Sequence, residues 1–145
     1  MSIGPVDLVV LKYTGDRFTG IPAAQIQSLA DAGFIRLIDV LFARKDADGE
    51  VSVLELDELE DEVTGQLQPI VSDKTDLLNH DDLVSLTSDW APRTTAVAIL
   101  FEHVWARIIR DAVHDAGGEV VLAERIPRNV IDELERAQKG EALTR

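Results

Sequence analysis

The sequence predicts an α+β fold, in which two βαβ units build a ferredoxin-like sheet with an added β-hairpin strand and a C-terminal helix. The order strand, helix, strand occurs twice, once before residue 57 and once after residue 94. The tripeptide Asp-Ala-Gly closes both expected helices, at 31–33 and 115–117. Asp48-Gly49 is a strong hairpin signal between two strand-like segments. A doubly wound α/β sheet is the alternative fold.

The first half of the chain, residues 1–57, opens with the β-rich segment VDLVVLKY, which ends at Tyr13-Thr14-Gly15. Pro22 suits the first turn of a helix. The residues that would share one face of this helix then follow at the helical spacing i, i+3, i+4 and i+7, at Ile26, Leu29, Ala30 and Gly33. We expect Gly33 to end that helix, because glycine adopts the left-handed conformation easily. The hairpin strands follow.

Residues 58–93 form an acidic connecting segment with one short helix. Asn79 is the expected helix cap, and Asp81 and Asp82 are favourably placed in the first turn. The inner side of this helix is expected to carry Leu83, Leu86 and Trp90, with Pro92 ending it.

The second half, residues 94–140, predicts a strand (TTAVAILFE), a helix (HVWARIIRDAVHDAGG) and a further strand (EVVLAERI). A last helix is expected to begin near Pro127 and to end at Gly140, followed by a frayed tail at 141–145. Its buried stripe would be Val130, Ile131, Leu134 and Ala137. At 145 residues, 1–145 is expected to be a single domain.

Both faces of the predicted sheet are apolar. Leu8 and Val10 point to one face of the first strand, while Val9 and Leu11 point to the other. Helices cover one face, so a partner subunit or residues 60–92 must cover the second. We therefore expect a homo-oligomer, a dimer or larger.

The composition excludes several classes of partner. Lys and Arg number 14 against 27 Asp and Glu, a formal charge of −13 that repels phosphate backbones and anionic lipid. No nucleic-acid or membrane binding is expected. The chain has no cysteine, no apolar run long enough to span a bilayer and no signal-like N-terminus, which favours a cytoplasmic protein.

Three stretches resemble a family of small, functionally uncharacterised soluble bacterial proteins: GPVDLVVLKYTGDRFTG, RLIDVLFARKDADGEVSVLEL and LFEHVWARIIRDAVHDAGGEVV. The resemblance covers nearly the whole chain. The layout is also similar to a broader family that has a glycine-rich membrane hairpin between two βαβ halves. Here the equivalent residues 60–92 are acidic and interrupted by Gln, Asp and Pro, so the membrane role does not carry over. The resemblance implies a fold and no activity.

The helix after residue 102 has two distinct sides. One side is apolar, with Trp105, Ile108, Ile109, Ala112 and Ala116. The opposite side has His103, Arg107, Arg110 and His114, which we interpret first as a solvated face and second as a surface for docking an acidic partner. One metal ion bridging both histidines is excluded, because eleven residues of helix separate them by about 16 Å.

Glu102-His103 is the candidate catalytic pair, because it lies where a strand turns into a helix. The alternative is a helix-start glutamate that interacts with backbone N–H groups, and this structural interpretation is preferred.

The loop TGDRFTG has the glycine spacing of a phosphate loop but lacks its Lys-Ser/Thr. A structural loop is therefore preferred over a ligand loop. If the protein binds a small molecule, the candidate ligand-binding residues are Tyr13, Asp16, Arg17, Phe18 and Trp90.

Metal and cofactor sites are not indicated. Residues 44–55 partly match a calcium loop, but Arg44 stands at its first position and strand-like segments flank it, so a hairpin is preferred. No nucleophile motif is present. The leading hypothesis is a non-catalytic, self-associating accessory module. A small-molecule sensor and a dimeric α+β-barrel-type enzyme using Glu102 and His103 are the alternatives.

Overall fold

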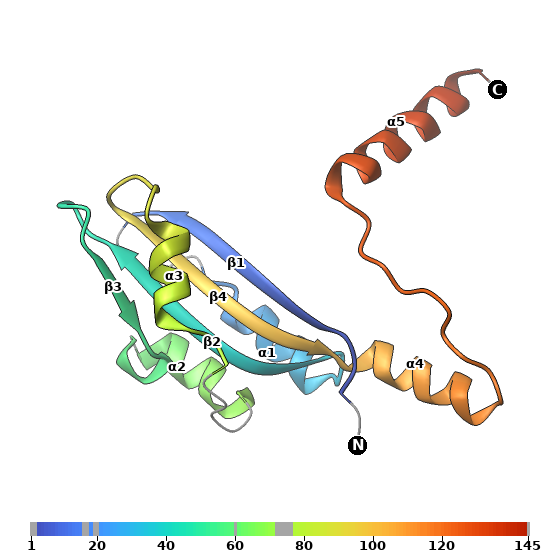
Figure 1. The fold of residues 1–145 in the computed structure, drawn as a ribbon, viewed down its shortest axis with the longest axis horizontal. Helices are drawn as coiled ribbons and strands as arrows, with labels where there is room; N and C mark the ends of the chain where they lie inside the picture. The colour runs from blue at the N-terminus through green and yellow to red at the C-terminus, as the bar shows by residue number, and fades with distance from the viewer. Residues whose placement is uncertain (1–2, 16–17, 19–20, 60, 72–76, 145) are drawn as a thin grey trace. The chain divides into compact units, whose positions relative to one another are not determined.

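The computed structural model of the chain describes residues 3–15, 18, 21–59, 61–71 and 77–144. Contacts divide the chain into two compact units, Met1–Asp111 and Ala112–Arg145. The first unit contains a four-stranded sheet and the helices that pack on it (Figure 1).

The sheet consists of β1 (Val6–Thr14), β2 (Ile35–Lys45), β3 (Val51–Leu54) and β4 (Thr94–His103). Its order is β1-β4-β2-β3, and every neighbouring pair is antiparallel. β1 and β2 are therefore parallel to one another, with β4 between them and α1 (Ala23–Asp31) connecting them. This is a βαβ unit with an inserted strand, and the predicted α+β class is confirmed. The doubly wound alternative is wrong, because its sheet would contain neighbouring parallel strands.

The predicted hairpin joins β2 and β3. Asp46 organises the turn, because its Oδ1 atom accepts hydrogen bonds from the backbone amides of Asp48 (2.9 Å) and Glu50 (3.0 Å). Gly49 has φ 84°, the left-handed conformation that this turn requires. Residues 44–55 thus form strand and turn as predicted, with no helix on either side of the turn.

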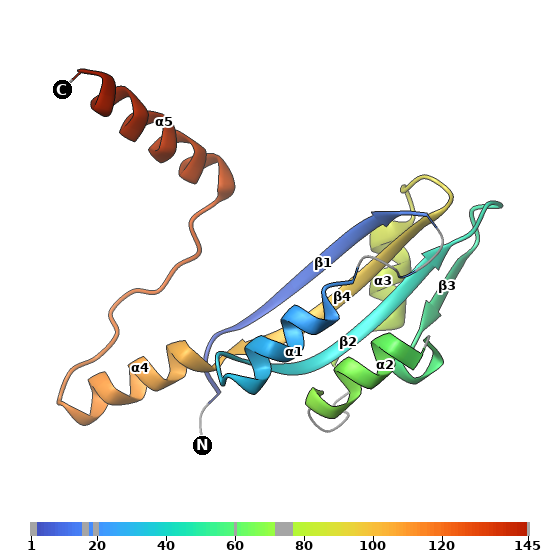
Figure 2. The ribbon, with the colours of Figure 1, turned by 180° about the vertical axis from the view of Figure 1, so that it is seen from behind.

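One face of the sheet is covered by α1 and by α2 (Asp61–Leu67) with its flanking 3-10 turns, as Figure 2 shows. The buried residues of this core come from both helices and from alternate positions of β2 and β4: Ala23, Leu37, Val40, Phe42, Leu67, Val97 and Ile99. Gly33 ends α1 with φ 82°, as its sequence position predicts.

Part of the opposite face is covered by α3 (His80–Thr87), which crosses in front of the sheet in Figure 1. Asn79 caps this helix as predicted, its side chain accepting a hydrogen bond from the Asp81 amide at 2.8 Å. The second core consists of Leu41, Ala43, Leu83, Ala96 and Ala98. The sequence predicts that either a partner subunit or residues 60–92 cover this face. The structure shows that α3, which lies within 60–92, covers part of it.

β4 leads without a loop into α4 (Val104–Asp115). The sequence interpretation of the polar side of this helix as its solvated face implies a buried apolar side, and the structure corrects this. No residue of α4 is buried, and Trp105, Ile108 and Ile109 are 48%, 59% and 55% exposed.

The second unit differs from prediction in its secondary structure. Residues 118–127 are in neither helix nor strand, although EVVLAERI was expected to form one. α5 (Arg128–Thr144) begins after Pro127 as predicted but continues through Gly140 and along the expected tail. Gly117 has φ 84° and follows the end of α4, which confirms the shared Asp-Ala-Gly helix ends.

Candidate functional site

Glu102 is the most deeply buried acidic residue in the described chain, with 0% exposure near the end of β4. Its Oε2 atom accepts a 2.6 Å hydrogen bond from the Gly4 amide. Its Oε1 atom accepts one of 2.9 Å from Arg36 Nε, and Arg107 Nε lies 3.5 Å from Oε2. Both oxygens of this carboxylate are thus engaged by partners from three separate segments of the chain.

The pKa of Glu102 lies below its ordinary value of 4.5. Burial of the carboxylate raises this pKa, but the hydrogen bonds from Gly4 and Arg36 and the charges of Arg107 and Arg36 together lower it by more. A general acid would need the opposite shift, so the arrangement favours a permanent anion that joins three segments.

His103 is the last residue of β4, and its side chain points to the opposite face of the sheet from Glu102. Its Nε2 atom lies 2.7 Å from Asp7 Oδ2, and Trp105 Nε1 donates to its Nδ1 at 3.2 Å. Since an indole can only donate, Nδ1 accepts and Nε2 carries the proton shared with Asp7. The ring also packs edge-on against Phe101, with centroids 5.1 Å apart.

The predicted polar stripe is corrected at its first member. The sequence places His103 opposite Trp105 on a helix, whereas the two rings pack together with centroids 5.8 Å apart. His103 belongs to a strand, where the helical angle does not apply.

The other members of the stripe lie on α4. Arg107 pairs with Glu102, and Arg110 donates to the Ile3 carbonyl at 3.1 Å. His114 is exposed in the last turn of the helix. Arg110 therefore attaches α4 to the N-terminal segment, and Arg107 attaches it to Glu102 at the end of β4.

The described candidate ligand-binding residues do not converge. Tyr13 and Phe18 pack on the core under α1 and α2, where Phe18 meets Phe42 edge-on at 5.4 Å. Trp90 packs on the other core, with Lys12 Nζ 4.9 Å from its ring centroid. Asp16 and Arg17 lie outside the described residues.

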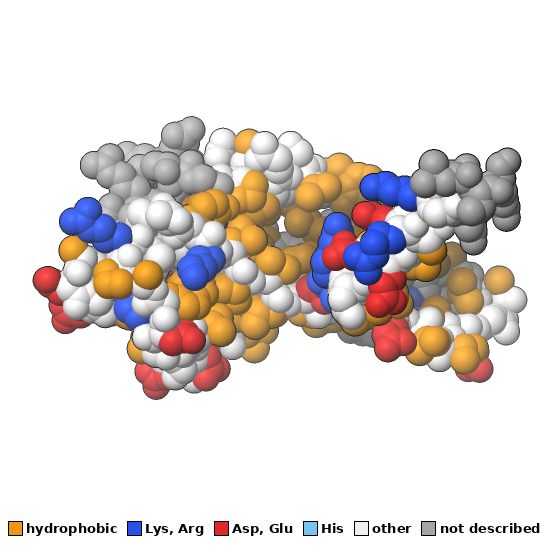
Figure 3. Space-filling model, turned by 90° about the horizontal axis from the view of Figure 1, so that it is seen from above, with side chains coloured by type: hydrophobic (Ala, Val, Ile, Leu, Met, Phe, Trp, Pro, Cys, Tyr) orange, Lys and Arg blue, Asp and Glu red, His pale blue; other side chains and the backbone are white. Residues whose placement is uncertain are grey.

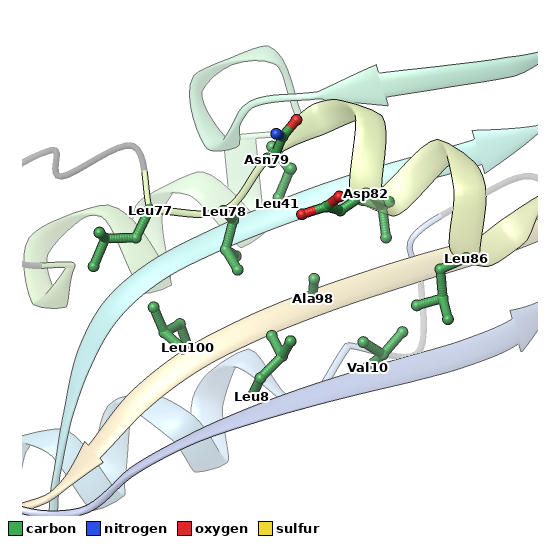
Figure 4. A pocket seen from close by; sticks show the side chains of 11 residues that line it. Leu8, Val10, Leu41, Leu77, Leu78, Asn79, Asp82, Leu86, Ala98 and Leu100 are labelled. Carbon is green, nitrogen blue, oxygen red and sulfur yellow. The ribbon is translucent and has the colours of Figure 1, made fainter.

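A groove that the sequence did not reveal lies between α3 and the strands β1 and β4 (Figure 4). It has a volume of about 300 Å³. Leu8 and Val10 enter it from β1 and Leu100 from β4, facing Leu78 and Leu86 across the opening. The complete lining is Leu8, Val10, Leu41, Leu77, Leu78, Asn79, Asp82, Leu83, Leu86, Ala98 and Leu100.

The groove exists because α3 is too short to cover a whole sheet face. Eight residues of helix span about 12 Å, whereas nine residues of β1 span about 30 Å. Leu8 is consequently exposed on the strand, as is Leu86 on the helix. Figure 3 shows hydrophobic side chains gathered in a broad area of the face that it draws. The alternation along β1 signalled two apolar faces, but not how much of each is covered.

A family model matches residues 2–141, and its description is a family of unknown function (DUF6325). The chain belongs to this family. The match agrees with the resemblance to small uncharacterised proteins, and DUF6325 brings no activity with it. No curated protein and no solved structure matches the chain. In the described part of this DUF6325 chain, no helix combines the length and apolar character needed to cross a membrane.

Proposed function

We propose that this DUF6325 protein is a non-catalytic cytoplasmic module that acts by associating with a second copy of itself. The observation that carries the proposal is the apolar face of α4. Three large side chains, those of Trp105, Ile108 and Ile109, share this face and are about half exposed. Full burial of one such side chain stabilises a protein by roughly 1.5–3 kcal/mol, so covering this face provides a substantial driving force.

A second copy is favoured by the local charge of α4. The chain as a whole has a formal charge of −13, which opposes association between copies. α4 itself contains two arginines and two aspartates, Arg107, Arg110, Asp111 and Asp115, so its formal charge is zero with His114 neutral. Two such helices can therefore approach one another without net charge repulsion between them. A two-fold pair would bury the same patch on each copy.

The geometry of the candidate catalytic pair supports a role without chemistry. Glu102 is held as a buried anion by Gly4, Arg36 and Arg107. His103 uses both ring nitrogens within the chain. Neither residue lines the groove between α3 and the sheet.

The test is the mass of the protein in solution at micromolar concentration. We expect a species of twice 15.9 kDa by light scattering or sedimentation. Ile108→Glu should weaken association by about tenfold or more, because it places a carboxylate in an apolar contact. The matched control is Val84→Glu, which changes an exposed valine on α3 and should leave the mass unchanged. A monomer at every concentration would contradict the proposal.

Small-molecule binding is the second candidate function, and the groove beside α3 favours it. A volume of about 300 Å³ lies at the lower end of the range for small-ligand pockets. Among the lining residues that the structure describes, Asp82 is the one with a charge, so the expected ligand is an apolar chain with a cationic end. Dodecylamine should raise the melting temperature, and dodecanoate of equal length should not. Equal shifts, or none with either, would contradict this assignment.

A further inference from the structure

β1 forms an open edge of the sheet in the described part of the chain. It pairs with β4 along all nine residues, and the sheet order gives it no neighbour on its other side. Half of its backbone groups therefore point away from the sheet and can accept another strand. The strand contains no proline, and Val6 and Leu8 are exposed. The opposite edge is β3, which has only four residues.

The second unit contains a segment with the composition of a missing strand. Residues 119–126 lie in neither helix nor strand, and Val121 and Leu122 are 87% and 77% exposed. Val120 and Ile126 are exposed as well. In a strand, Val120 and Leu122 would face one side and Val121 and Ala123 the other. Such a segment suits a sheet that has an apolar core on both faces.

The topology provides a place for this segment. Residues 119–126 placed antiparallel to β1 would be parallel to β4, and α4 would be the connection between them. β4, α4 and 119–126 would then form a second βαβ unit with β1 inserted. This is the arrangement that β1, α1 and β2 already have, with β4 inserted.

Length and charge select one register. When Arg125 lies opposite Asp7, Ile126 pairs with Val6 and all eight residues fall within the nine of β1. The same register places Leu122 opposite Val10. Opposite charges facing each other across two strands stabilise their pairing, and Asp7 would then contact Arg125 in addition to His103.

The start of α4 indicates which copy receives the strand. To deliver residues 119–126 to its own β1, α4 would have to lie across the sheet as α1 does. Its first turns are instead attached to the end of the sheet. The Trp105 amide donates to the Phe34 carbonyl at 3.3 Å, Arg107 pairs with Glu102, and Arg110 bonds the Ile3 carbonyl. No residue of α4 belongs to either core.

We propose that residues 119–126 of one copy add as a fifth strand to the free edge of β1 in a second copy, and that the exchange is reciprocal. The inference rests on the proposed self-association and specifies its mode. Within the pair, strands from each copy complete the other's sheet. In this register Leu122 lies opposite Val10 beside the groove, and Leu122 and Ile126 flank Leu8 diagonally.

Disulfide trapping tests the inference directly, because the natural chain has no cysteine. Val10→Cys and Leu122→Cys variants are purified separately, mixed and oxidised. We expect a mixed disulfide-linked dimer, since opposed residues of neighbouring strands lie within disulfide range. In the control, Leu122→Cys is mixed with Ser52→Cys, whose cysteine lies on the opposite edge strand β3. This mixture should yield less mixed dimer, by about tenfold or more.

Proline substitution gives a second, independent measurement. Val121→Pro removes a backbone donor and should reduce the cross-linking of the same cysteine pair at least about tenfold. Val121→Thr retains strand propensity and should leave cross-linking largely intact. Residue 121 lies outside every helix of the structure, so the helical circular dichroism of both variants should match that of the parent.

Each adverse outcome contradicts either the strand exchange alone or the proposed self-association as well. Association without the β1 cross-link, and insensitive to Val121→Pro, overturns strand exchange and leaves the proposed function standing. A disulfide within one monomer of the double variant Val10→Cys/Leu122→Cys shows that the chain completes its own sheet, which overturns the role of a second copy. A monomer with neither product overturns both proposals.

Discussion

The Gly4 amide and the Glu102 carboxylate, 98 residues apart in the sequence, meet at 2.6 Å. This contact attaches the segment before β1 to the end of β4, and Arg36 adds the start of β2. A second contact at the same end, from the His103 amide to the Pro5 carbonyl at 2.8 Å, continues the β1–β4 pairing outward. Three segments are therefore joined around one buried anion, at the point where the sheet gives way to α4.

Gly4→Ala should destabilise the protein by about 1–3 kcal/mol. A Cβ atom at this position would lie 2.8 Å from Arg107 Cβ and 3.0 Å from the His103 carbonyl oxygen. Neither is the free end of a side chain, so the N-terminal segment must move and its bond to Glu102 must lengthen. Urea unfolding measures the loss. The control is Gly65→Ala, in α2, where a Cβ atom meets open space and the change should be neutral or stabilising. Equal effects would show that the close approach at Gly4 is unimportant.

Glu102→Gln should reduce the free energy of unfolding at neutral pH by about 2–3 kcal/mol, because a buried carboxylate loses charge-assisted hydrogen bonds. The same change at exposed Glu50 should have little effect. Urea unfolding curves of the two variants give the comparison. A small effect at Glu102 would mean that the anion does not hold the three segments together.

The destabilisation by Glu102→Gln should depend on pH. The folded-state pKa of Glu102 is lowered below 4.5, so the folded protein binds this proton more weakly than the unfolded chain. The stability that Glu102 provides is therefore fully present above the unfolded pKa. It is lost as the pH falls below 4.5 and through the folded value. The difference in unfolding free energy between parent and Glu102→Gln should shrink on acidification in that window. A constant difference would contradict the lowered pKa.

The parts of the fold that were predicted from sequence depend on local signals. Asp48 and Gly49 mark the hairpin turn, and Asn79 caps α3 two residues before its partner amide. Gly33 and Gly117 adopt the left-handed conformation that ends each helix. In each case the interacting groups are neighbours in the chain, so their pattern is visible without the structure.

The features of the fold and the site that the sequence does not predict depend on residues distant in the chain or on the exact residue at which a strand ends. Glu102 was identified as a candidate, but its burial depends on Gly4 and Arg36, which lie 98 and 66 residues away. The sequence places His103 in the helix, opposite Trp105. In the structure His103 is the last residue of β4, and its ring packs against that of Trp105. The apolar pattern of α4 and of residues 119–126 was recognised. A pattern states that a face needs cover, and not which surface covers it.

Thr95→Val should leave stability unchanged or raise it by up to about 1 kcal/mol. Thr95 is buried in β4, and within the described residues its hydroxyl oxygen has no hydrogen-bond partner. Valine has nearly the same shape and removes the unpaired polar group. Its neighbour provides the control, since the Thr94 hydroxyl donates to the Ala91 carbonyl at 2.8 Å and Thr94→Val should destabilise by about 1 kcal/mol. Thermal unfolding of both variants gives the comparison, and a loss at residue 95 as large as at 94 would contradict the assignment.

Lys45→Met should loosen α3 from the sheet and cost about 1–3 kcal/mol of stability. Lys45 is buried at the end of β2, and its Nζ atom donates to the carbonyl oxygens of Thr87 (3.1 Å) and Ser88 (2.8 Å). These carbonyls form the C-terminal end of α3, where a positive charge is favourable. Methionine keeps the apolar stem and leaves both carbonyls without this donor. Hydrogen exchange should become faster in α3 and stay unchanged in α1, whereas Lys139→Met on α5 should alter neither. Because α3 forms one wall of the apolar groove, Lys45→Met should also lower the affinity of any ligand that binds there.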